Sequence, residues 1–243
     1  MITRRQFILS TTAMVGGPLL LGACSSGTSD ESYKAAVRRT WRHAEDRIGN
    51  SSLVQRELVR YATLAPSSHN TQCWKFRVEE HAISILPDLS RRCSAVDPDD
   101  HHLFVSLGCA AENLIQAALA NGLNGKARFD ASAAGGIRVA LEPTKAIVSP
   151  LYQAILERQC TRAEFDGKPL STGELRMLEQ AGTGDGVRVR FLTEKAAMEK
   201  VLEYVVEGNT AQLNDPAFVK ELKNGFASTV RRLFEPGMAC SPD

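Results

Sequence analysis

Several features are scarce in this sequence, and each scarcity excludes a class of protein. The 29 basic and 28 acidic side chains among 243 residues nearly cancel, leaving a net charge of +1. Such a chain has no overall field that attracts nucleic acid or an anionic membrane surface, and it carries no nucleic-acid-binding motif, so we expect no nucleic-acid partner. With 43% hydrophobic and 23% charged residues, the composition is globular rather than disordered or collagen-like.

Cysteine is also scarce, and its spacing excludes a common kind of metal site. Six cysteines are too few for a disulfide scaffold in a chain of this length. No two of them lie within four residues of each other, so the close cysteine pair of a zinc ribbon is missing. We therefore expect no structural metal.

The N-terminus has the pattern of an export signal. Arg4 and Arg5 precede Phe7, an apolar stretch runs over 8–21, and Leu21-Gly22-Ala23-Cys24 follows. The stretch is too short and too rich in glycine for a membrane span. Residues 1–24 resemble a twin-arginine signal that ends in a lipobox, so we expect a periplasmic or envelope location with a lipid on Cys24. The alternative is plain signal cleavage, with Cys24 a bystander.

The hydrophobic periodicity that follows predicts an α+β fold. Residues 25–52 read as a polar tether and a helix over 33–47, and the glutamate of Ser171-Thr172-Gly173-Glu174 completes a capping box. Apolar residues at helical spacing predict helices over 53–64, 103–121, 151–158, 175–181 and 195–208. Alternation predicts strands over 74–78, 82–86, 128–130, 137–141 and 187–192.

The most informative segment is the loop over 65–74, which places two hydroxyls and an amide pair between a helix end and a strand. Asparagine and glutamine amides can donate to and accept from the polar edge of a flat heterocycle. The loop, Pro66-Ser67-Ser68-His69-Asn70-Thr71-Gln72-Cys73-Trp74, resembles the flavin loop of the nitroreductase superfamily. It departs from that pattern at Cys73, where the family usually has proline.

A second segment strengthens the resemblance. Arg158-Gln159-Cys160-Thr161-Arg162 resembles the family's Arg-x-Ser-x-Arg element, whose cations and hydroxyl hold the phosphate and ribityl of FMN. Cys160 replaces the hydroxyl here. Because this element follows the flavin loop, the chain resembles the tandem-half, Acg-like branch, in which two halves of one chain imitate a dimer. The halves would be 53–145 and a partial 146–224.

The resemblance implies a function and a set of cofactor-binding residues. It implies an FMN-dependent oxidoreductase that transfers a hydride from NAD(P)H to a small nitro compound or a quinone. The flavin would contact Ser67, Ser68, Asn70, Gln72, Arg158, Cys160 and Arg162, and no side chain is identified as catalytic. The alternatives are a non-catalytic flavin-binding or storage protein and an inactive truncated fragment.

The last segment does not follow the pattern expected of the family. Relatives tend to continue with Trp-Ile-Arg-Phe-Asn where this chain has Gly225-Phe226-Ala227-Ser228-Thr229. One additional base before the codon of Gly225 allows the family's reading, so we interpret 225–243 as a frameshifted tail. The alternative is a divergent natural end. The coding DNA around Asn224 distinguishes the two.

A lipid on Cys24 predicts that Cys24→Ala abolishes lipid attachment, while replacing Arg4 and Arg5 with lysine blocks export. Fractionation with a labelled fatty acid measures both effects. A parent protein that carries no labelled lipid, together with unchanged membrane fractionation of Cys24→Ala, contradicts the prediction.

Overall fold

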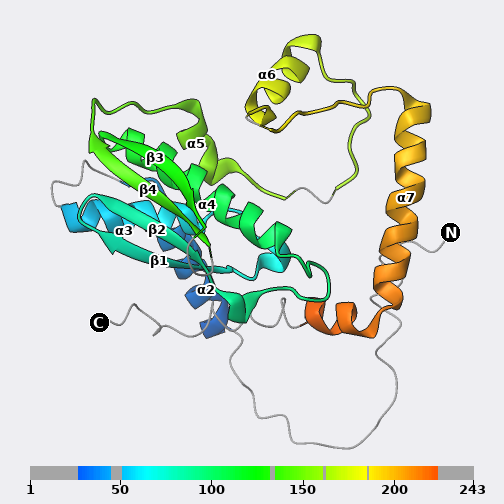
Figure 1. Cartoon of the computed structure of the whole chain (residues 1–243), viewed down its shortest axis with the longest axis horizontal. Helices are drawn as coiled ribbons and strands as arrows, with labels where there is room; N and C mark the ends of the chain where they lie inside the picture. The colour runs from blue at the N-terminus through cyan, green and yellow to red at the C-terminus, as the bar shows by residue number, and fades with distance from the viewer. Residues whose placement is uncertain (1–26, 45–50, 132–134, 161–162, 185, 224–243) are drawn as a thin grey trace, which may run out of the picture.

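A computed structural model describes residues 27–44, 51–131, 135–160, 163–184 and 186–223 (Figure 1). The predicted α+β class is confirmed, because helices pack on a four-stranded sheet of order β1-β2-β4-β3. The export signal with Cys24, the residue Arg162 and the segment 225–243 lie outside the described residues.

The sheet is built from two antiparallel hairpins. β1 (Trp74–Glu79) pairs with β2 (Ala82–Pro87), as the alternating pattern predicted. β3 (Leu123–Asp130) and β4 (Gly136–Pro143) are longer than predicted, because they pair over their full lengths, from Leu123 opposite Pro143 to Asp130 opposite Gly136. β4 also pairs with β2, which joins the hairpins into one sheet.

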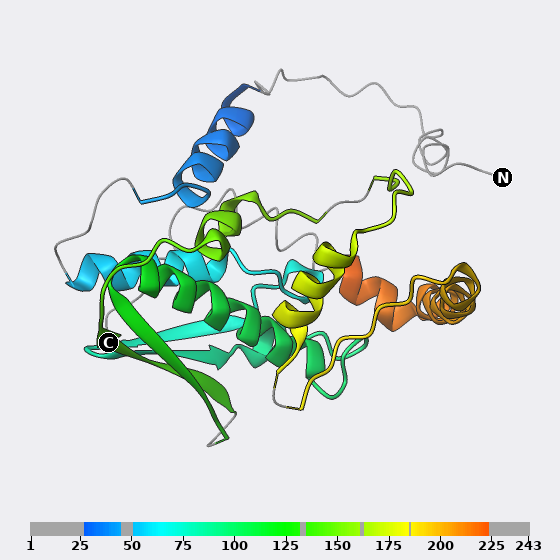
Figure 2. The same cartoon turned by 90° about the horizontal axis from the view of Figure 1, so that it is seen from above.

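Helix α4 (His101–Ala120) is the centre of the core. Its buried residues include Leu107, Leu114 and Ala118, which are fully shielded from solvent. It packs on β2, β3 and β4 on one side and against α3 (Ser51–Thr63) on another, so both helices cover the same face of the sheet (Figure 2). Its length and hydropathy would suffice for a membrane span, but this packing identifies it as the core helix.

The residue directly before α4 does not cap the helix with its side chain. Asp100 adopts a left-handed conformation with φ 58° and makes no side-chain cap bond. The cap comes instead from Asp97, which is buried and whose Oδ2 accepts a hydrogen bond from the Leu103 N–H at 3.0 Å. The turn over Pro98 brings this earlier carboxylate back to the helix end.

Helix α5 (Pro150–Glu157) is fixed to the core by a tyrosine pair. The hydroxyls of Tyr61 in α3 and Tyr152 in α5 lie 2.6 Å apart and are buried. Tyr61 Oη also accepts a hydrogen bond from the Ala44 N–H at 3.2 Å. The pair therefore joins three segments, namely α3, α5 and the chain after α2 (Gly27–Thr40).

The chain from 163 to 215, excluding the undescribed residue 185, is called the arm below, and it stands away from the sheet (Figure 1). It contains α6 (Thr172–Gly182), which begins with the predicted capping box at Ser171, and α7 (Lys195–Asn214). One expectation was wrong, because the strand over 187–192 is reduced to an isolated bridge between Gly184 and Val187. The apolar face of α7, with Val201, Leu202, Val205 and Val206, is exposed.

From the contacts of the tyrosine pair we predict that removing the two hydroxyls lowers the free energy of unfolding by unequal amounts. Tyr152→Phe leaves the Tyr61 hydroxyl with other partners, so we expect a loss of about 1 kcal/mol in the free energy of unfolding. Tyr61→Phe leaves both the Tyr152 hydroxyl and the Ala44 N–H without that partner, so we expect about 2 kcal/mol. Urea unfolding measures both, with exposed Tyr204→Phe as the control. Equal costs contradict this account.

Candidate functional site

The loop predicted to bind a cofactor connects α3 to β1 and has an unusual backbone. It contains the short helix η1 (Ser68–Asn70). His69, Asn70 and Gln72 adopt left-handed conformations with φ of 47°, 54° and 54°. Non-glycine residues rarely occupy this region, and such residues cluster at functional sites when surrounding contacts hold them there.

Three hydrogen bonds hold this backbone. The Gln72 N–H donates to Ser67 Oγ at 3.0 Å, which closes the loop on itself. The Ser68 N–H donates to Ser106 Oγ in α4 at 3.3 Å, and Arg91 donates to the Gln72 carbonyl at 3.2 Å. The loop is therefore tied to the core helix on one side and to the turn after β2 on the other.

The two predicted amides lie side by side. Gln72 Nε2 donates to Asn70 Oδ1 at 3.2 Å, and the contact is exposed to solvent. The structure thus brings Ser67, Ser68, Asn70 and Gln72 together in one short loop, with an accessible amide pair. This arrangement can offer hydrogen bonds to the edge of a planar ring system.

Arg158 connects the second predicted segment to this loop. It follows α5, and its Nη2 donates to the carbonyl of Leu64 at 3.1 Å, across a sequence separation of 94 residues. Leu64 lies immediately before the loop. Residues that the sequence places far apart therefore meet at the base of the candidate site. Exposed Cys160 lies beside the guanidinium, with Sγ 3.8 Å from Arg158 Nη1, while Arg162 lies outside the described residues.

The Arg158 guanidinium has one donor without an acceptor. Its Nε is buried and makes no hydrogen bond to any described residue. A buried donor left unpaired costs stability unless a ligand or water supplies the acceptor. Guanidinium groups bind phosphate through charge-assisted hydrogen bonds, so this donor fits the phosphate of FMN. The donor set at the loop and at Arg158 is thus chemically suited to that cofactor.

Asp88, which no sequence pattern singled out, supports the loop through its contacts with Cys73 and Arg91. Asp88 is buried, its N–H donates to the Cys73 carbonyl at 2.9 Å, and its carboxylate accepts from Ser90 Oγ at 2.6 Å. The same carboxylate pairs with Lys75 at 3.1 Å and with Arg91 at 3.3 Å. Since Arg91 also binds the Gln72 carbonyl, Asp88 positions the arginine that holds the loop. An aspartate directly after a strand was the signal for this turn.

The environment of Asp88 favours its charged form. Burial alone would raise its pKa, but the hydrogen bonds from Ser90 and the ion pair with Lys75 outweigh that effect, so the pKa lies below its ordinary value.

The pKa values of two cysteines near the loop are shifted upward instead. Burial raises the pKa of Cys73, and burial together with the charge of Glu221 raises that of Cys93 to about 11. Both are neutral thiols in this structure at neutral pH.

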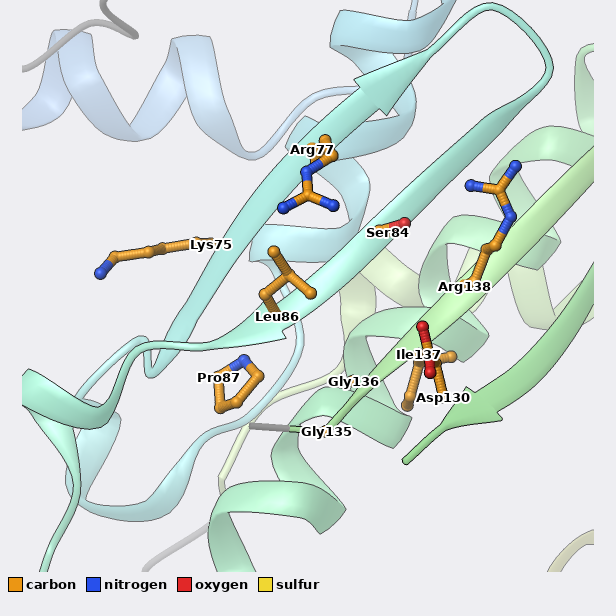
Figure 3. Close-up of a pocket in the computed structure, with 10 residues that line it drawn as sticks. All are labelled: Lys75, Arg77, Ser84, Leu86, Pro87, Asp130, Gly135, Gly136, Ile137 and Arg138. Carbon is orange, nitrogen blue, oxygen red and sulfur yellow. The ribbon is translucent and has the colours of Figure 1, made fainter. Parts of the chain in front are cut away.

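A separate pocket of about 270 Å³ lies on the face of the sheet opposite α4 (Figure 3). Lys75, Arg77 and Arg138 bring positive charge to it, and none of the predicted cofactor residues lines it. Lys75 pairs with Asp88 and Arg138 with Glu79, which neutralises much of this charge. The pocket therefore offers less attraction to an anion than its arginines suggest.

Comparison with known proteins gives a distant relationship. No protein-family model matches the chain. Two proteins of Mycobacterium tuberculosis are each 28% identical to it over 175 residues. They are "Putative NAD(P)H nitroreductase Rv3131" of strain H37Rv and "Putative NAD(P)H nitroreductase MT3217" of strain CDC 1551. The match covers 69% of this chain and 49% of each relative, so the chain spans about half the length of these curated relatives. The α+β structure fits a nitroreductase-like fold.

The lowered pKa of Asp88 predicts a pH-dependent effect of Asp88→Asn. A carboxyl group whose folded-state pKa is depressed stabilises the protein above its unfolded pKa, and this contribution is lost as the pH falls through the folded value. We expect Asp88→Asn to destabilise the protein at neutral pH, and the difference from the parent to shrink in acid. Urea unfolding at several pH values measures this, with exposed Asp99→Asn as the control. A difference that does not depend on pH contradicts the role of the charge.

Proposed function

We propose that the protein is an FMN-binding, nitroreductase-like oxidoreductase that transfers a hydride from NAD(P)H to a small nitro compound or quinone. The observation that carries the proposal is the buried, unpaired Nε of Arg158 at the base of the loop with the Asn70 and Gln72 amides. The names of the two relatives point to the same class of chemistry.

The residues divide into two groups by the part of the cofactor that each would contact. Arg158 and Arg162 would bind the phosphate as cations, with the sulfur of Cys160 in place of a hydroxyl. Ser67, Ser68, Asn70 and Gln72 would bind the polar edge of the ring. The strained backbone, tied to Ser106 and Arg91, would hold these donors in place before the cofactor arrives.

When bound, FMN would supply the electron chemistry, namely acceptance of a hydride from the nicotinamide and its delivery to the acceptor, with one further proton from solvent. The protein's contribution is binding and orientation, so no acidic or basic side chain is required to react. This agrees with the hydroxyls of Ser67 and Ser68 and the amides of Asn70 and Gln72, none of which gains or loses a proton near neutral pH.

We further propose that the protein works in the cell envelope, held by a lipid on Cys24. The twin-arginine pattern of Arg4 and Arg5 supports this proposal, because that route exports proteins already folded around a cofactor.

The cofactor proposal predicts that Asn70→Ala and Gln72→Ala each weaken FMN binding by about 1–3 kcal/mol, because buried flavin atoms lose hydrogen bonds. Arg158→Lys keeps the charge but removes the Nε donor, so we expect weaker binding there too. Quenching of flavin fluorescence during titration of the detergent-solubilised full chain measures each affinity. Arg77→Lys, on the opposite face of the sheet, is the matched control.

Two results separate the proposed enzyme from its alternatives. Oxidation of NADPH by the FMN-loaded protein in the presence of a quinone or nitroaromatic acceptor supports the reductase. Stable flavin binding without turnover favours a storage protein. A well-folded chain that binds no FMN would overturn the cofactor proposal.

A further inference from the structure

Three potential metal ligands from distant parts of the chain converge beside the loop. They are His69 in η1, Cys93 after the turn η2 (Leu89–Arg91), and Glu221 in the helical residues 216–223. Their ligand atoms all lie within 4.8 Å of one another. Cys93 is 5% exposed, and the other two are half-buried, so the cluster is a built interior contact rather than a chance meeting of surface side chains.

The spacing is close to that of a tetrahedral metal site. His69 Nδ1 and Cys93 Sγ are 4.0 Å apart. With zinc about 2.0 Å from nitrogen and about 2.3 Å from sulfur, two tetrahedral ligands stand about 3.5 Å apart. A shift of about half an ångström would therefore bring this pair to ligand geometry, which a side-chain rotation can supply.

Neighbouring groups already orient two of the three ligands. The Glu221 carboxylate accepts hydrogen bonds from the N–H groups of Ala95 and Val96, at 3.0 and 3.3 Å. A carboxylate has about four lone-pair positions, so two backbone bonds leave room for a cation. The His69 ring lies edge-on to Phe218 with its centroid 5.9 Å away. Metal-binding carboxylates are usually held by such outer hydrogen bonds, and the contact with Phe218 restricts the orientation of the imidazole.

We propose that His69, Cys93 and Glu221 form a binding site for a divalent cation of the zinc class, with the fourth position open to water. Mixed nitrogen, sulfur and oxygen ligands favour zinc over magnesium or calcium, which prefer oxygen alone. Binding replaces the proton of the Cys93 thiol by the metal and releases that proton to solvent, with no change of oxidation state. The site stands independently of the flavin proposal.

Such a site would fasten the end of the arm to the loop. Phe218 is the sole buried residue in the described part of 163–223, and Glu221 lies one helical turn beyond it. The contacts of these two residues with His69 and with Ala95 and Val96 hold the C-terminal helical residues against the main body. A cation shared by the two sides would add a bond that spans them.

The test uses Zn²⁺ and Co²⁺ with the full chain in detergent. We expect one Zn²⁺ per chain after dialysis, and Co²⁺ binding with sulfur-to-cobalt charge-transfer absorption in the near ultraviolet. His69→Gln and Glu221→Gln should each weaken affinity by at least about tenfold, and Cys93→Ser should also remove the charge-transfer absorption. The matched controls are His101→Gln, Cys109→Ser and Glu142→Gln, which should bind as the parent does.

Three outcomes overturn the proposal: a parent chain that retains no metal, absorption that survives in Cys93→Ser, or controls that lose as much affinity as the three site variants. Thermal unfolding without metal checks that each variant is folded. Loss of Zn²⁺ in a variant whose melting temperature matches the parent supports a ligand role. Flavin content is not a readout here, so failure of this proposal and failure of the cofactor proposal are distinguishable.

Discussion

Burial of α4 is the constraint on which the rest of the structure depends. The helix presents apolar residues to three strands and to α3, and it also contacts α5 and η1. Burying each large apolar side chain contributes about 1.5–3 kcal/mol, so this one helix supplies a large share of the favourable free energy of the core. Its Ser106 and Asp97 contacts also fix the candidate loop and the turn before it. The candidate site is therefore attached directly to the core helix.

Two features that cost free energy lie near the loop, namely a strained backbone and an unpaired buried donor. Left-handed conformations at three non-glycine residues cost free energy, as does the unpaired Nε of Arg158. The loop persists because Ser106, Arg91 and Ser67 each supply a hydrogen bond to its backbone. A native structure keeps such costs where a ligand recovers them, so the coincidence of both costs at one place is itself an argument for binding there.

The sequence predicted the helices, strands and cap that depend on neighbouring residues. It did not predict the contacts between segments that lie far apart along the chain. Periodicity placed α3, α4 and the β1-β2 hairpin, and the capping box placed Ser171, because these depend on neighbours along the chain. The contact between Arg158 and Leu64 was not predicted, since 94 residues separate them, and the family resemblance implied only that Arg158 and the loop contact the same cofactor. The cluster of His69, Cys93 and Glu221 was invisible, because cysteine spacing reports only ligands that lie close in sequence. Asp97 caps α4 although it lies four residues before the helix begins, because the turn over Pro98 brings its carboxylate back to the helix end.

The exposed apolar face of α7 is another feature that the local sequence pattern could not predict. Amphipathic spacing shows that a helix has an apolar face, but it does not show what covers that face. Val201 and Val205 remain 46% and 58% exposed, since no described segment packs on them. The arm is joined to the main body at its two ends, near Arg158 and near Phe218. Both joints meet the candidate loop, one at Leu64 and the other at His69. The residues at both ends of the arm therefore contact the segment that would hold a cofactor.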